Sequence, residues 1–178
     1  MTSPRTSFWL AALTVTLGVS SAARTQTPPV APAPAPGPSL ELASAAARTA
    51  LDACKAKGFS VGVSVIDSGG VLKVLLAQDG TSARGVQSST NKATTSLTFK
   101  DATSHLGERV KSDAELAQAV SANAAFNVRA GGVLLKVKDR IVGAIGVGGA
   151  HGSENDEACA LAGIQAVQGR LDAEFAAH

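Results

Sequence analysis

The chain has 178 residues, of which 45% are hydrophobic and 3% aromatic, and its 16 Lys and Arg against 14 Asp and Glu give a formal net charge of +2. This length and composition suit one globular domain of ordinary size. Because the charge is nearly balanced and forms no basic stripe, we do not expect nucleic acid or an anionic membrane as the main partner.

Residues 1–23 have the pattern of a secretory signal peptide. Arg5 precedes an apolar run over 8–19, and small residues precede a cleavage site after Ala23. The run is shorter than the ~20 residues that a membrane-spanning helix needs, so no stable membrane insertion is expected after cleavage. We therefore expect a periplasmic or secreted protein.

Residues 24–38 contain the tract PPVAPAPAPGP, which has no core-forming pattern. Such a composition favours an extended, semi-rigid chain. We interpret residues 24–38 as a linker and residues 39–178 as the globular domain.

The domain is predicted to begin with a helix and a hairpin. Ser39 suits an N-cap position, and small apolar residues follow it at helical spacing. Alternating valines over 61–65 and the turn Asp67–Gly70 then predict a hairpin whose second strand covers 71–76. A helix over 82–99 follows. It is rich in Ser and Thr, which compete with helical hydrogen bonds, and we expect its polar side to border a cleft.

The second half of the domain is predicted to form another hairpin and a final helix. Residues 101–120 are expected to form a loop with one or two short helices. Strands over 133–138 and 141–147 form the hairpin, and the last helix covers about 154–174. The order α-β-β-α-α-β-β-α predicts an α+β fold, in which helices flank an antiparallel sheet.

A glycine-rich loop over 146–152 precedes the last helix. The dinucleotide motif G-x-G-x-x-G would require glycine where His151 stands, and no parallel βαβ unit surrounds the loop. The acidic start of the helix would also repel a pyrophosphate. Glu154 and Glu157, with Asp156 between them, are candidate metal ligands, because carboxylates three residues apart share one side of a helix. The alternative is a well-capped helix start that faces solvent.

Cys54 and Cys159 lie in the first and last predicted helices and have no metal-type spacing. In an oxidising compartment they can form a disulfide. Otherwise they are small buried hydrophobic residues.

Five segments occur in an order that resembles the GlcG/HbpS family, also called the haem-binding or haem-degrading domain: Val61–Leu72, Asn91–Thr95, Gly131–Val133, Asp139–Ala150 and Asp156–Gly163. The resemblance covers nearly all of the domain. It implies a profilin-like sandwich, with the first and last helices on one face of the sheet and the middle helices on the other. It would place Cys54 and Cys159 on neighbouring helices, which leaves the disulfide open.

The resemblance also implies a small ligand, with haem or a related tetrapyrrole as the first expectation. Some members bind iron through acidic patterns, and higher oligomers are known, so a homo-oligomer is expected. Haem iron needs a His, Met, Cys or Tyr ligand, and the chain contains no Tyr. The candidate cofactor-binding residues have three roles. The possible iron ligands are His105, His151 and Thr103. Lys92 and Arg109 would bind the propionates, and Phe99 would form an aromatic wall. Arg129 is a further candidate for binding the propionates, and Phe126 is a further candidate for the aromatic wall.

No hydrolase, zinc-protease or P-loop motif occurs, and we assign no catalytic residue. The favoured function is an exported ligand-binding protein. Two alternatives stay open: an oligomeric scaffold or sensor-accessory protein, and an enzyme that degrades haem or converts a small organic acid. The candidate residues for the enzyme are His105, Lys92 and Asp67.

Overall fold

The computed structural model describes residues 34–177, so the predicted signal peptide and most of the predicted linker lie outside the described residues. In chain order the elements are α1 Leu40–Lys55, β1 Gly62–Asp67, β2 Leu72–Ala77, α2 Ala83–Phe99, α3 Thr103–Arg109, α4 Ala114–Ser121, β3 Gly132–Val137, β4 Arg140–Gly148 and α5 Ser153–Ala176. The predicted order is confirmed, and the region after α2 holds two short helices. In the part of the chain that the structure describes, no helix is long and apolar enough to cross a membrane.

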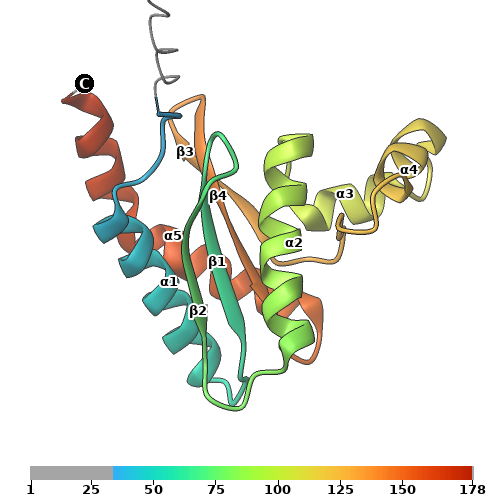
Figure 1. Cartoon of the computed structure of the whole chain (residues 1–178), viewed down its shortest axis with the longest axis horizontal. Helices are drawn as coiled ribbons and strands as arrows, with labels where there is room; N and C mark the ends of the chain where they lie inside the picture. The colour runs from blue at the N-terminus through green and yellow to red at the C-terminus, as the bar shows by residue number, and fades with distance from the viewer. Residues whose placement is uncertain (1–33, 178) are drawn as a thin grey trace, which may run out of the picture. The chain divides into compact units, whose positions relative to one another are not determined.

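The four strands form one antiparallel sheet in the order β2-β1-β4-β3. The two predicted hairpins therefore join side by side through their central strands, with Val63 of β1 opposite Val147 of β4. Helices α1 and α5 pack on one face of the sheet, and α2 packs on the other (Figure 1). Every residue of β1 is consequently buried. The predicted α+β sandwich is confirmed.

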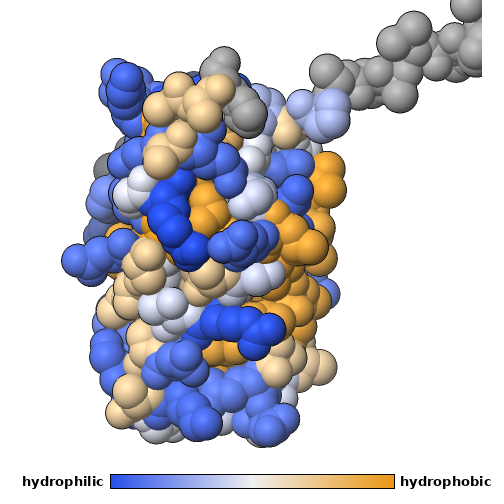
Figure 2. Space-filling view, turned by 90° about the vertical axis from the view of Figure 1, so that its left-hand side faces the viewer, coloured by the Kyte–Doolittle hydropathy of each residue, from blue (hydrophilic) through white to orange (hydrophobic). Residues whose placement is uncertain are grey.

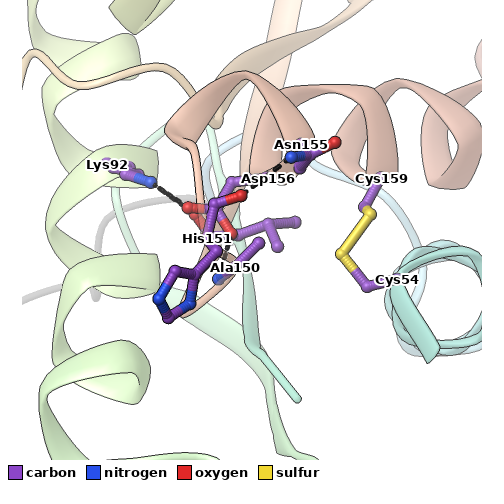
Figure 3. The surroundings of a disulfide bond; sticks show 8 residues. Cys54, Lys92, Ala150, His151, Asn155, Asp156 and Cys159 are labelled. Carbon is purple, nitrogen blue, oxygen red and sulfur yellow. Dashed lines mark hydrogen bonds and ion pairs between the residues drawn. A yellow bond between two sulfur atoms is a disulfide. The ribbon is translucent and has the colours of Figure 1, made fainter. Parts of the chain in front are cut away.

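The main core lies between the sheet and the pair α1 and α5, where valines of the strands meet alanines of α1. These small side chains let the two helices approach closely: a Cβ atom on Gly163 of α5 would lie 2.5 Å from the carbonyl oxygen of Ala46 in α1. A disulfide between Cys54 and Cys159 joins the same two helices, and both cysteines are fully buried (Figure 3). Of the two alternatives that the sequence left open, a disulfide or two free buried cysteines, the structure therefore has the disulfide.

On the other face of the sheet, α2 lies directly against glycines of β3 and β4. A Cβ atom on Gly132, Gly146 or Gly148 would collide with backbone atoms of α2. The hydroxyl group of Ser89 in α2 also shares a hydrogen bond with that of Ser64 in β1, at 2.8 Å. The small side chain of Ser89, which is hydrogen-bonded to the sheet, is therefore part of this close contact.

Residues 34–38, the end of the predicted linker, pack onto the domain. Pro38 is buried, and the backbone N–H of Ser68 in the β1–β2 turn donates to the carbonyl oxygen of Pro36 at 3.0 Å. A Cβ atom on Gly37 would collide with Asp67, the last residue of β1. The packed part of the chain therefore begins before Ser39.

Strand β2 is an edge of the sheet. It exposes the apolar side chains of Leu72 and Leu75, and Val71 just before it is also exposed. The side of the molecule that carries α1 and α5 is largely polar, with apolar surface gathered along one edge (Figure 2). Exposed apolar strand edges are typical of contact surfaces. The homo-oligomer nevertheless stays a prediction.

Two glycines of α5 offer a matched test of the α1–α5 contact. Gly163→Ala should lower the free energy of unfolding by about 1–3 kcal/mol, because the added methyl group overpacks the contact with α1. Gly169→Ala should raise it by about 1 kcal/mol, because Gly169 is exposed with no atom near its would-be Cβ and alanine favours helix. Urea unfolding measures both, and equal shifts in the two variants would contradict the close contact.

Candidate functional site

A cavity of about 530 Å³ lies between the first half of α2, the segment before β3 and the loop before α5. Its lining is mainly polar, and α2 with its N-cap contributes Ser82, Arg84, Gly85, Gln87, Ser88, Asn91 and Lys92. The remaining lining residues are Ala124, Phe126, Asn127, Arg129, Gly149, Ala150 and Asp156. The prediction that the polar side of this helix borders a cleft is confirmed.

Lys92 and Asp156 form a buried ion pair beside this cavity (Figure 3). The Nζ atom of Lys92 donates to Oδ2 of Asp156 at 2.7 Å and to the carbonyl oxygen of Val147 at 3.0 Å. The other oxygen of Asp156, Oδ1, accepts from the backbone N–H of Ala150 at 2.9 Å. The pair therefore joins α2 to β4, to the glycine-rich loop and to the first turn of α5.

The two side chains are only 2% and 4% exposed. Burial lowers the pKa of Lys92, and the hydrogen bond and negative charge of Asp156 offset this effect only in part. The positive charge of Arg129 lowers the pKa of Lys92 further, whereas the negative charge of Glu157 raises it. The amine is thus easier to deprotonate than an exposed lysine.

Gly131 makes room for the ion pair. Its φ angle is +126°, and a Cβ atom there would lie 2.9 Å from Nζ of Lys92 and 2.8 Å from Cβ of Asp156. A side chain at this position would be both strained and too close to the pair. The glycine that the sequence places before β3 therefore has a defined steric role.

His151 follows Ala150, a lining residue, and is exposed on the glycine-rich loop. The loop is held in place by a hydrogen bond at 2.8 Å, which Asn155 Nδ2 donates to the carbonyl oxygen of His151 (Figure 3). His151 is thus adjacent in sequence to a lining residue but does not itself line the cavity.

His105 and Arg109 lie on α3 and do not line the cavity. Nδ1 of His105 is 2.9 Å from Oδ1 of Asp101, and Nη1 of Arg109 is 3.5 Å from Oδ2 of the same carboxylate. Partial burial acts to raise the pKa of Asp101, but the hydrogen bonds from His105 and the backbone N–H of Ala102, with the charge of Arg109, hold it below its ordinary value. These residues form a separate surface cluster.

Thr103 and Phe99 also lie outside the lining. The hydroxyl oxygen of Thr103 accepts from the backbone N–H of Gly132 at 2.8 Å and is fully buried, so it supports the start of β3. Phe99 packs edge to face against Phe126, with ring centroids 5.1 Å apart. Because Phe126 lines the cavity, Phe99 acts on the site by holding that ring.

The structure does not bring Glu154, Asp156 and Glu157 together as a set of ligands. Glu154 is exposed, Asp156 turns inward to Lys92, and Oε1 of Glu157 accepts from the hydroxyl group of Ser104 at 2.9 Å. Within residues 34–177, no three His, Cys, Asp or Glu side chains are arranged to hold a metal ion. The expected exposed acidic turn is therefore wrong for Asp156, which is buried.

Arg84, Asn91 and Asn127 line the cavity although none of them was predicted as a site residue, and the pairing of Lys92 with Asp156 was not predicted either. Arg84, Ser88 and Asn91 are spaced by three or four residues, so they share one side of α2. This spacing is a signal that a closer reading of the helix could have used. No comparable signal marks Asn127, which lies in an irregular segment.

A family model described as "Haem degrading protein HbpS-like" matches residues 39–165. A crystal structure of HbpS is 31% identical, with a TM-score of 0.68 and coverage of 76% of this chain and 93% of that chain. A double mutant of the Streptomyces reticuli HbpS is 30% identical, with a TM-score of 0.68 and coverage of 82% and 97%. A PduOC:haem complex shares the fold at 24% identity, with a TM-score of 0.68 and coverage of 73% and 94%.

No functionally curated protein matches the chain. The family match covers most of the described domain, and the match to HbpS extends over nearly the whole of that protein. The chain belongs to the HbpS-like family.

Proposed function

We propose that the chain is an exported protein that binds haem or a related tetrapyrrole in the cavity beside α2. The observation that carries the proposal is the placement of Arg84, Arg129 and Phe126 around one cavity in a member of the HbpS-like family. The PduOC neighbour was solved as a haem complex, which supports the same class of ligand. Cavities of this volume commonly hold cofactor-sized ligands.

The lining contains side chains that suit the propionates and the macrocycle of haem. Arg84 and Arg129 are suited to the two propionates, because guanidinium groups form paired hydrogen bonds with carboxylates. Phe126, supported by Phe99, offers an aromatic surface to the macrocycle. Bound haem would supply an iron centre for ligand binding or electron transfer.

The iron ligand must come from outside the lining, which contains no His, Met, Cys or Tyr. We assign this role to His151, because it follows a lining residue on the glycine-rich loop and is exposed. His105 is tied to Asp101 on α3 and does not line the cavity. Of the two histidines considered from the sequence, His151 is therefore the better placed.

The haem proposal predicts distinct effects for cavity and control variants. His151→Ala should weaken and shift the Soret band that forms on titration with haemin. Arg129→Gln should raise the Kd about tenfold, since it removes a charge-assisted hydrogen bond. His105→Ala and Arg48→Gln, which change exposed residues outside the cavity, should bind haemin as the unaltered chain does.

Absorbance spectroscopy with micromolar haemin measures these effects. The absence of a Soret change in the unaltered chain would contradict haem binding. An equal loss in His105→Ala and His151→Ala would contradict the assigned site. Consumption of the bound haem under reductant and oxygen would support the degrading enzyme over simple binding.

Export is supported by the sequence pattern of residues 1–23 and by the disulfide between Cys54 and Cys159, because disulfides persist mainly in oxidising compartments. We expect the protein recovered from the periplasm or medium of its host to begin at Arg24. N-terminal sequencing measures this directly. Recovery in the cytoplasm with Met1 retained would contradict export.

A further inference from the structure

The amine of Lys92 is a chemical group beside the cavity that haem binding does not use. It is buried, it lies 2.7 Å from a carboxylate, and both residues line the cavity. Lysines that are buried or placed beside another cation are the ones that proteins use to form imines with carbonyl compounds. We propose that the cavity takes small 2-oxo acids, with the Lys92 amine condensing with their carbonyl group and Arg84 and Arg129 holding their carboxylate.

The surroundings of the amine favour this reaction. Asp156 and Glu157 face it from α5, Arg129 faces it from the segment before β3, and the carbonyl oxygen of Val147 accepts a hydrogen bond from it. Burial and the charge of Arg129 lower the pKa of Lys92, which increases the fraction of neutral amine. Asp156, within hydrogen-bond distance, can accept the proton that the ammonium group releases.

The cavity lining matches a small polar acid. Two guanidinium groups come from different elements, Arg84 from α2 and Arg129 from the segment before β3. The carboxamides of Asn91 and Asn127 add donors and acceptors for a short, oxygen-rich molecule.

The reaction balances without an oxidant or reductant. The Lys92 ammonium gives a proton to Asp156, and the neutral nitrogen attacks the carbonyl carbon, so that a C–N bond forms and the carbonyl electron pair moves to oxygen. A proton then passes from nitrogen to this oxygen. Asp156 returns its proton as the C–O bond breaks and water leaves. The products are water and a protonated imine that is paired with the Asp156 carboxylate.

Reductive trapping tests the proposal. The full chain is incubated with glyoxylate and cyanoborohydride, and the products are analysed by intact mass and peptide mapping. We expect one adduct per chain on Lys92, and none with glycolate, which has a hydroxyl group in place of the carbonyl. Lys92→Arg keeps a positive charge opposite Asp156 and should lose the adduct. Lys57→Arg, an exposed control, should keep it.

Arg129→Gln should slow the labelling of Lys92 about tenfold, which corresponds to one charge-assisted contact with the carboxylate. Arg48→Gln should leave the rate unchanged. Because Lys92→Arg can disturb the core, the peptide map of the unaltered chain decides by itself. No adduct, or labelling spread over exposed lysines with Lys92 unmodified, would overturn the proposal. The proposal does not rest on haem binding, and no haem is present in the reaction, so either proposal can fail alone.

Discussion

The ion pair between Lys92 and Asp156 is the interaction on which the site depends. Its two members are 64 positions apart in sequence, and their hydrogen bonds also reach the carbonyl oxygen of Val147 and the backbone N–H of Ala150. Removal of two charges from water is expensive, so such a pair is stable only when further hydrogen bonds complete it. Here the hydrogen bonds to Val147 and Ala150 complete the pair, which thereby forms a fixed junction of α2, β4 and α5.

The close contacts around this junction explain why glycines surround it. Gly131 leaves space for the pair, and Gly132, Gly146 and Gly148 let the backbone of α2 lie directly on the sheet. On the opposite face, Gly163 and the disulfide hold α5 against α1. Because α5 packs against both α1 and strands β3 and β4, its first turn presents Asp156 to Lys92 in a defined position. The part of the cavity that α2 and the first turn of α5 contribute is thus fixed in position, which favours selective binding.

The fold was predictable because its elements carry clear periodicity: the valines of 61–65 alternate, and the apolar residues of α1 recur at helical spacing. The site was less predictable because its contacts are tertiary. Asp156 has the sequence context of a solvent-facing first turn, and only the packing of α5 turns it inward. His105 and His151 were both candidate iron ligands, and only the fold shows that the first lies on α3 and the second follows a residue that lines the cavity. The Pro/Ala tract gave no signal that residues 34–38 pack on the β1–β2 turn.

The most direct test of the account is the stability of two variants in urea unfolding. Asp156→Ala should lower the free energy of unfolding by about 3–5 kcal/mol, because it leaves the Lys92 ammonium buried without its partner. The double variant Lys92→Met, Asp156→Ala should recover a clear part of this loss, since no unpaired charge then remains in the core. An Asp156→Ala variant as stable as the unaltered chain would contradict the central role of the ion pair.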